Sequence, residues 1–432
     1  MRKVAALAAS MCVGMSMSGA KAVDISLKSS LYQSFEGNSN YLMQTQPTGV
    51  VYTPVSTITF DGVARTPTMR FAATVDLSYQ TYFGPGAETL LPAFNRGFRG
   101  SAEKFDNMTT YKLEGSVRTV QAFQLQLAET GVSTVGGDVT TSWIEYGVRR
   151  QLSYWDLVTW SARATSLQFT APNTVPSLDL LTTGTWTHRV NQLTELIPMV
   201  QFESVAYGSP TNSTGAGNTQ FLIWRGTIGV SSQLTKRLTF SGAVGVTHIT
   251  LNQSGSATLP SGTTVLNASG SAADWIANIL TSYRLTSRDT LSLVAAQTIG
   301  PDSLGVLRKF DNVGLVLAHR FDRYAGLSIT TDYSHQPLLA GGFTDLYSAG
   351  VTYDFQFLPE WRSAVSYRFR QRIGVPGDAN SHAVFMSVNR DVTIIPSPSG
   401  QPAAPTPADI TALLSWPAAW IQPWRTASWW QR

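Results

Sequence analysis

The chain has 432 residues, of which 43% are hydrophobic, 11% aromatic and only 13% charged, and its formal net charge is +4. Soluble globular domains carry roughly 25% charged residues, and a membrane-spanning helix needs an apolar run of about 20 residues, which this sequence lacks. The small, dispersed positive charge gives no support for nucleic-acid binding. Composition therefore disfavours a soluble domain, a helical membrane protein and a nucleic-acid binder.

Residues 1–22 have the features of a secretion signal. Arg2 and Lys3 precede a short apolar stretch, and the segment ends in an A-x-A cleavage pattern at Ala22. The only cysteine, Cys12, lies inside this segment, so a mature chain cut after Ala22 has no thiol for a disulfide or a metal site. We expect an exported protein; a lipid anchor on Cys12 is the less favoured alternative.

Residues 360–370 show the alternation of a strand with one apolar and one polar face. Trp361 and Tyr367 hold odd positions, whereas Arg362 and Arg368 hold even ones. Side chains alternate across a strand, so one face is apolar and the other is charged. Because similar segments recur along most of the chain behind an export signal, the pattern favours a closed barrel with lipid outside and water inside.

The alternation predicts an all-β fold, a transmembrane antiparallel up-and-down β-barrel over residues 23–392. Eighteen strands are favoured, and 16 is the alternative if the first hairpin is a plug or is disordered. Short polar turns should face the periplasm and longer Gly-, Ser- and Thr-rich segments the outside. The predicted strands are 24–36, 49–60, 67–83, 107–118, 121–130, 139–152, 155–169, 180–191, 195–207, 220–233, 237–251, 273–285, 289–299, 309–320, 323–334, 344–356, 360–371 and 380–391.

The N-terminal part of this assignment depends on one long segment, Gly84 to Asp106, which we expect to be an external loop. Strand 107–118 would then run toward the periplasm, and a further strand at 121–130 would return to the outside. The long loop is the predicted constriction or plug of the barrel. Its candidate constriction residues are Arg96, Arg99 and Lys104.

The polar faces of the predicted strands carry charged residues of both signs. One interpretation is an aqueous channel whose arginine-rich wall selects solutes, anions among them. The other is that opposite charges pair across neighbouring strands and stabilise a wet interior. The candidate lumen-lining residues are Arg70, Asp76, Lys112, Glu114, Arg118, Arg225, Arg284, Arg320, Asp332, Asp354, Arg362, Arg368 and Arg370.

Residues 393–432 change character and are predicted to form a Pro-rich linker followed by a Trp-rich periplasmic tail. Five of the twelve tryptophans of the chain fall within its last 17 residues. Trp416, Trp420 and Trp424 are candidates for docking a periplasmic protein partner. A tail that rests at the membrane interface, where tryptophan partitions well, is the favoured alternative.

Sequence motifs give no support for catalysis or for a cofactor. None of the five histidines is spaced like a metal-ligand pair, so no metal site is predicted. Asp332, Ser334 and His335 are close in sequence at an expected outer rim, but no nucleophile or orienting group can be assigned. The chain is therefore predicted not to be an enzyme, and a barrel hydrolase is the disfavoured alternative.

Several short segments resemble a bacterial family of outer-membrane β-barrel porins, some of whose members are encoded with exopolysaccharide synthesis. The segments that carry the resemblance run from Asp106 to Tyr111, from Glu129 to Val132, from Leu234 to Arg237 and from Leu285 to Arg288. The likeness covers about residues 24–392. It implies the barrel architecture and residence in the bacterial outer membrane, and it names no active-site residues.

These observations predict an outer-membrane barrel that forms a passive pore for small hydrophilic solutes or an outlet for a secreted polysaccharide. Its expected partners are outer-membrane lipid and the transported solute, without nucleic acid. The alternative function is a structural or docking barrel that recruits a periplasmic protein through its Trp-rich tail.

Overall fold

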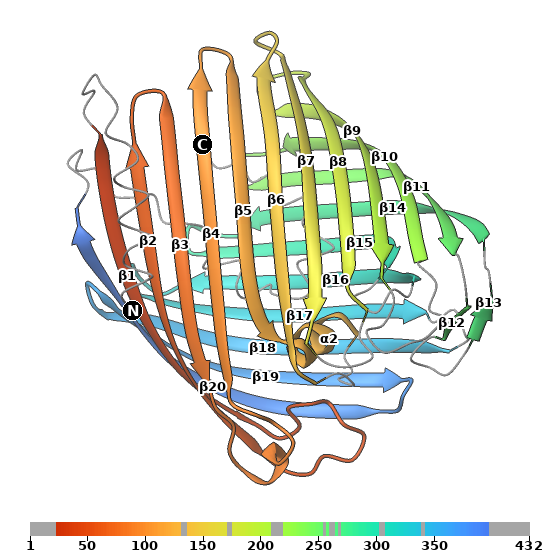
Figure 1. The fold of residues 1–432 in the computed structure, drawn as a ribbon. Coiled ribbons are helices and arrows are strands. Elements are labelled where there is room, and N and C mark those ends of the chain that lie inside the picture. Colours follow the sequence, from red (N-terminus) through yellow and green to blue (C-terminus); the bar gives the residue numbers. More distant parts are fainter. Residues whose placement is uncertain are drawn as a thin grey trace.

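In a computed structural model, the chain forms a closed antiparallel β-barrel of 18 strands (Figure 1). The structure describes residues 23–130, 136–170, 175–208, 219–253, 256–258, 264–266, 269–301, 307–337 and 342–396. Strands adjacent in sequence pair with each other, and β1 pairs with β20 to close the barrel. The predicted fold class and the predicted strand number are therefore correct.

The barrel strands are β1 (Asp24–Asn38), β2 (Val51–Arg65), β3 (Met69–Gln80), β4 (Ala93–Asp106), β5 (Thr109–Gln121), β6 (Asp138–Gln151), β7 (Asp156–Phe169), β8 (Ser177–Arg189), β9 (Thr194–Tyr207), β10 (Thr219–Gln233), β11 (Leu238–Gln253), β14 (Ser269–Arg284), β15 (Asp289–Pro301), β16 (Leu307–Arg320), β17 (Ala325–Pro337), β18 (Phe343–Leu358), β19 (Trp361–Gly374) and β20 (Ala379–Ile395). A separate two-stranded sheet contains β12 (Ser256–Thr258) and β13 (Thr264–Leu266). The helical elements of the described residues are the 3-10 turn η1 (Pro85–Ala87) and the helix α2 (Ala122–Thr130).

The outer surface of the barrel is apolar and the inner surface is polar. On β11, Val244 and Val246 are 60% and 65% exposed, whereas Thr247, on the opposite face, is 1% exposed. The same outward exposure of large apolar side chains occurs on β10 at Trp224 and Ile228. A soluble protein would bury such side chains, so their continuous exposure around a closed sheet indicates contact with lipid. The protein is a transmembrane β-barrel of the bacterial outer membrane.

The strand count is correct, but two elements in the N-terminal part were predicted wrongly. Residues 121–130 were expected to form a strand and form α2 instead, while 93–106, expected to belong to a loop, form β4. Consequently β5 runs toward the long-loop end of the barrel, opposite to the predicted direction. The two errors cancel in the count.

The two errors have different causes. Alternating Gln and Leu in 124–127 imitates a strand, although the segment is helical. The segment 84–106 was expected to be one long loop, but its second part is β4, in which Gly97 lies against the Asp76 side chain of β3 and an added Cβ would be 2.8 Å from Asp76 Oδ2. Here glycine permits close packing between strands and does not mark a turn.

The two ends of the barrel differ in the length of their connections. One end has short connections such as 66–68, 107–108 and 359–360, and β1 begins and β20 ends there. The other end has longer connections, including 39–50 and 81–92. Outer-membrane barrels place short turns in the periplasm, so we assign the short-turn end to that side.

Short periplasmic turns are closed by their own side chains. Ser153 Oγ donates to Asp156 Oδ2 at 2.7 Å and accepts from the Asp156 backbone N–H at 3.0 Å. Thr286 and Asp289 repeat this arrangement in the turn between β14 and β15, where the Asp289 N–H donates to Thr286 Oγ1 at 3.0 Å. These local bonds explain why the polar turns could be predicted from sequence.

The predicted signal peptide and most of the predicted tail lie outside the described residues. This applies to residues 1–22 and 397–432, and the latter range contains Trp416, Trp420 and Trp424. The structure leaves both segments as predictions.

Candidate pore interior

The strand register places all thirteen predicted lumen residues on one face of the barrel wall. Arg70 pairs with Glu103, and Glu103 pairs with Lys112 on the next strand. Antiparallel partners project to the same side of a sheet, so the shared face can be followed from strand to strand around the barrel. Five of the thirteen lie near the short-turn end, namely Arg70, Arg284, Arg320, Asp354 and Arg362.

A charged cluster lies on this face across β4 and β5. The Glu114 side chain is 9% exposed and accepts a hydrogen bond from Lys112 Nζ at 2.6 Å. It also forms an ion pair with the Arg99 guanidinium. Arg70 and Glu103 add a longer contact of 3.8 Å. The structure thus brings together two residues predicted to line the lumen, Lys112 and Glu114, with one predicted to lie in the constriction loop, Arg99.

A second set of charges lies on β9, β10 and β19. Arg225 forms an ion pair with Glu203, and both side chains are nearly buried. On β19, Arg368 lies 3.7 Å from Glu36 and its guanidinium carbon lies 4.5 Å from the centre of the Phe385 ring. These contacts show that opposite charges pair between strands on the inner face, as one of the two sequence interpretations held.

Sequence reasoning missed the partner residues of these pairs. Glu36, Glu103 and Glu203 all belong to strands and share the face of their arginine or lysine partners. Glu103 could have been found, because it and the predicted residue Lys112 are placed symmetrically about the turn at 107–108. Arg372 is the arginine of β19 nearest to the long-loop end. It is 1% exposed, and its Nε donates to the Gly377 carbonyl at 3.0 Å.

The predicted constriction loop is wrong over residues 93–106, because its three candidate residues belong to β4. Arg99 shares the inner face with Glu114, whereas Arg96 pairs with Leu77 and Lys104 pairs with Tyr111 on the opposite face. Because side chains alternate along β4, Arg99 points to one face of the wall and Arg96 and Lys104 to the other. The sequence analysis did not recognise this strand. The first part of the predicted loop, residues 84–92, does form a connection, and it folds inward together with two other segments.

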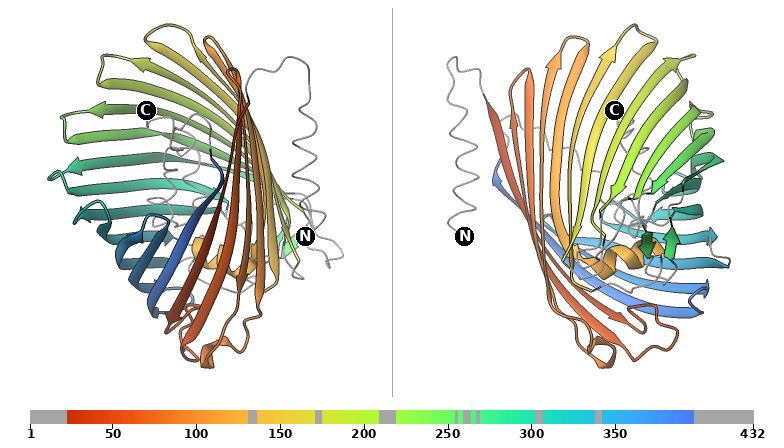
Figure 2. Two further views of the ribbon diagram at one scale, coloured as in Figure 1. Left: turned by 90° about the vertical axis from the view of Figure 1, so that its left-hand side faces the viewer. Right: turned by 45° about the vertical axis from the view of Figure 1, so that its right-hand side comes forward.

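Three connections at the long-loop end fold together into an apolar group, which we name the inner-loop cluster. Its rings come from the 39–50 connection, the 81–92 connection and α2, and Figure 2 shows α2 folded toward the inside of the barrel. The Tyr41 ring lies 5.6 Å from the Tyr82 ring and 6.1 Å from the Phe123 ring, with edge-to-face geometry. The remaining members of the cluster are Val51, Ala87, Leu42 and Leu90.

Hydrogen bonds attach the inner-loop cluster to the barrel wall. Gln124 Nε2 on α2 donates to Gln80 Oε1 of β3 at 3.0 Å, and Gln80 Nε2 donates to the Tyr41 hydroxyl at 3.2 Å. Burial raises the pKa of Tyr82 to about 12, so its hydroxyl stays protonated and donates to Gln121 Oε1. A group held by both packing and hydrogen bonds narrows the long-loop end of the interior.

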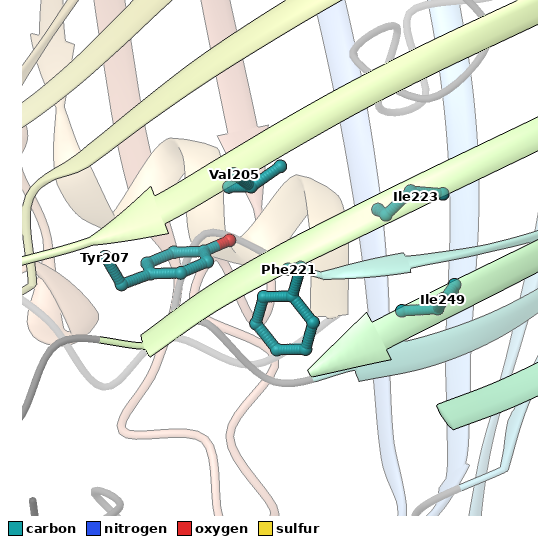
Figure 3. Close-up of a cluster of buried hydrophobic side chains, with 5 residues drawn as sticks. All are labelled: Val205, Tyr207, Phe221, Ile223 and Ile249. Carbon is teal, nitrogen blue, oxygen red and sulfur yellow. The ribbon is translucent and has the colours of Figure 1, made fainter. Parts of the chain in front are cut away.

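A second apolar group, which we name the wall cluster, lies on the inner face of β9, β10 and β11. It contains Val205, Tyr207, Phe221, Ile223 and Ile249, shown in Figure 3, each no more than 6% exposed. These residues share the face of Glu203 and Arg225. An apolar patch therefore interrupts the polar interior.

The described residues contain no group of three or more His, Cys, Asp or Glu placed to hold a metal ion. No helix among these residues is long and apolar enough to cross a membrane.

Comparisons with known proteins give a fold likeness without a family. No protein-family model matches the chain, and no curated protein matches it. The resemblance to a porin family inferred from short motifs thus has no matching family model.

Solved structures of outer-membrane barrels are similar to the chain at low identity. OccAB2 of Acinetobacter baumannii has a TM-score of 0.49 and 8% identity, covering 86% of this chain and 98% of that one. A BenF-like porin of Pseudomonas fluorescens has a TM-score of 0.45 and 9% identity, covering 86% and 99%. The siderophore receptor PiuA of Acinetobacter baumannii has a TM-score of 0.49 and 7% identity, covering 87% and 82%. Likeness at this level transfers no function.

Proposed function

We propose that the barrel is a passive pore for small hydrophilic solutes across the outer membrane. The observation that supports this most directly is the shared register of the charged residues, which gives a closed wall of 18 strands one polar inner face. Barrels of 16 to 18 strands are wide enough to leave an aqueous channel. The inner-loop cluster fills part of that width and makes the pore narrower than the wall alone would allow.

The thirteen residues predicted to line the lumen are proposed to form the walls of this pore. Nine of the thirteen are Arg or Lys, among them Arg368 and Arg370 on β19, and four are Asp or Glu, so this set of residues is predominantly positive. Such an arrangement produces a field across the lumen that orients and sorts charged solutes. Ion pairing reduces this field, so we expect a weak preference for anions.

Single-channel conductance of the refolded mature protein in planar bilayers tests the proposal. Stable conductance steps, with a reversal potential in a salt gradient shifted toward the anion potential, are the expected result. Folding is checked separately by resistance of the barrel to unfolding in SDS at room temperature. A folded barrel that produces no conductance steps would refute the open pore.

Two narrower hypotheses remain predictions from sequence alone. The polysaccharide outlet rests on the family resemblance. Docking through the tail rests on Trp416, Trp420 and Trp424, which the structure does not describe. Pull-down of a periplasmic protein by the isolated tail, abolished by Trp420→Ala with Trp424→Ala, is the measurement that would bring the docking hypothesis forward.

A further inference from the structure

The barrel wall contains a discontinuity between β14 and β15. The ladder that joins these strands runs from the pair Ala277 and Gln297 to the pair Arg284 and Thr290, a total of eight pairs. Residues 269–276 of β14 pair with β11 on their other side, but within the described residues no ladder joins them to β15. The long-loop half of β14 therefore has a backbone ladder along one edge, and on the other edge its Trp275 carbonyl accepts a hydrogen bond from Gln297 Nε2 at 3.3 Å.

Within the part of the chain that the structure describes, the long-loop end of the hairpin formed by β15 and β16 also lacks a ladder to β17. The β16–β17 ladder begins at the pair Asp311 and His335, so residues 307–310 pair with β15 alone. We name residues 298–301 of β15 and 307–310 of β16 the hairpin end. Among the described residues, its two strands pair with each other and with neither adjacent strand of the wall.

The hairpin end turns into the barrel. Arg225, an inner-face residue of β10, donates from Nη2 to the Ile299 carbonyl at 3.3 Å, although β11 and β14 separate the two strands in the wall. The Ile299 side chain packs against the wall cluster, and Phe310 on the paired strand is 2% exposed. The hairpin end thus covers the wall cluster on β9, β10 and β11.

A side-chain ion pair crosses the discontinuity. Lys309 Nζ lies 2.9 Å from Asp274 Oδ2, and both side chains are about one quarter exposed. Asp274 Oδ1 also accepts the Trp275 backbone N–H at 2.8 Å. This contact, which we name the latch, holds the hairpin end near β14 where backbone hydrogen bonds do not.

The length of the β14–β15 ladder indicates how deep in the membrane the discontinuity lies. A tilted transmembrane strand needs about 9 to 11 residues to cross the hydrocarbon region. The eight paired residues of β14 are too few, so the discontinuity begins at the depth of the outer leaflet. Unpaired backbone groups are tolerated there only beside protein or water, so this edge must face the hairpin end or water and not lipid.

We propose that this discontinuity is a lateral passage through which small uncharged apolar molecules move between the barrel interior and the outer leaflet. The wall cluster is their binding site, because it offers an apolar surface with the Tyr207 hydroxyl and the paired Arg225 at its edge. The hairpin end and the latch control access to it. This activity is additional to the axial pore for hydrophilic solutes.

Hydrogen exchange in lipid nanodiscs tests whether the edge is open. Amides of 269–276 that face β15 should exchange at least about tenfold faster than those of 244–251, which pair on both sides in β11. Lys309→Ala should accelerate the exchange further. Arg189→Ala, which removes a 3.0 Å ion pair with Glu195 at the other end of the barrel, should leave it unchanged. Equal protection of the two segments would overturn the proposal.

Uptake of the apolar fluorophore N-phenyl-1-naphthylamine by intact cells tests the passage itself. Joining Asp274→Cys to Lys309→Cys with a bismaleimide fixes the latch and should lower uptake toward that of cells without the barrel. Lys309→Cys alone, treated with the same reagent, is the matched control and should retain uptake. Uptake that is unaffected by the cross-link would contradict a lateral route.

A second variant tests the passage if the double-cysteine protein does not fold. Ile249→Asn places an amide in the wall cluster and should lower uptake of the fluorophore without changing exchange at 269–276. Ionic conductance is measured on every variant. A cross-linked barrel that conducts ions normally but excludes the fluorophore supports the lateral passage. A barrel that conducts no ions but still admits the fluorophore also supports the passage, and it refutes the axial pore.

Discussion

The short-turn end of the barrel is built from local interactions, whereas the long-loop end depends on contacts between segments far apart in the chain. At the short-turn end, Ser153 bonds to a residue three positions away. At the other end, Phe123 of α2 packs against Tyr41, and Arg225 bonds to the Ile299 carbonyl. A change at the short-turn end should therefore disturb a single hairpin. A change at the long-loop end should disturb several segments at once, because the inward-folded loops hold one another in place.

The largest effect should follow from disrupting the inner-loop cluster. Phe123→Ala removes a ring that packs on Tyr41 and Tyr82, and loss of a buried Phe costs about 3 to 5 kcal/mol in packed sites. We expect α2 to detach and single-channel conductance to rise clearly. Phe94→Ala, on the outer face and 57% exposed, is the control. Unchanged conductance in a folded Phe123→Ala barrel would show that the cluster does not restrict the pore.

The next effect should come from the charged cluster of β4 and β5. Glu114→Ala leaves Arg99 and Lys112 without their shared acceptor, and breaking a buried pair costs about 3 to 5 kcal/mol, an upper value here because Arg99 is largely exposed. The temperature at which the barrel loses SDS resistance should fall. Glu360→Ala removes an exposed pair with Arg390 and should change stability by no more than about 1 kcal/mol. Equal effects of the two variants would contradict the burial argument.

A smaller effect is expected on ion selectivity. Arg368→Gln removes one positive charge from the inner face of β19 and leaves Glu36 without its ion pair. The reversal potential in a salt gradient should move toward the cation potential, while the conductance changes little. Lys104→Gln, on the outer face of β4, should leave the reversal potential where it was. A shift of the same size in both variants would exclude control by the inner face.

The smallest effect should be found at a self-contained turn. Thr286→Ala removes hydroxyl bonds with the Asp289 side chain and backbone N–H, each contributing about 0.5 to 1.5 kcal/mol in typical cases and less where exposed. Refolding yield should fall slightly, with conductance unchanged. Thr286→Ser, which keeps the hydroxyl, should refold like the parent. A large loss on Thr286→Ala would show that the turn does more than close its hairpin.

Sequence reasoning succeeded where structure depends on neighbours in the chain. The alternation around Trp361 and Tyr367 predicted β19, and the polar turns predicted the short connections. It failed at β4 because Gly97 packs against Asp76 of another strand, which no local pattern shows. The charged residues could be assigned to a common face, but their partners, such as Glu36 for Arg368, required the register across strands.

The closure of the barrel also determines how the protein can be made. β1 and β20 pair along most of their length, and Ser381 Oγ donates to Asn38 Oδ1 at 2.6 Å across 343 positions of the chain. Since the first strand finds its second neighbour only when the last strand is available, closure must await synthesis and export of nearly the whole polypeptide. A chain truncated before β20 would present two open edges, prone to aggregation or degradation rather than insertion.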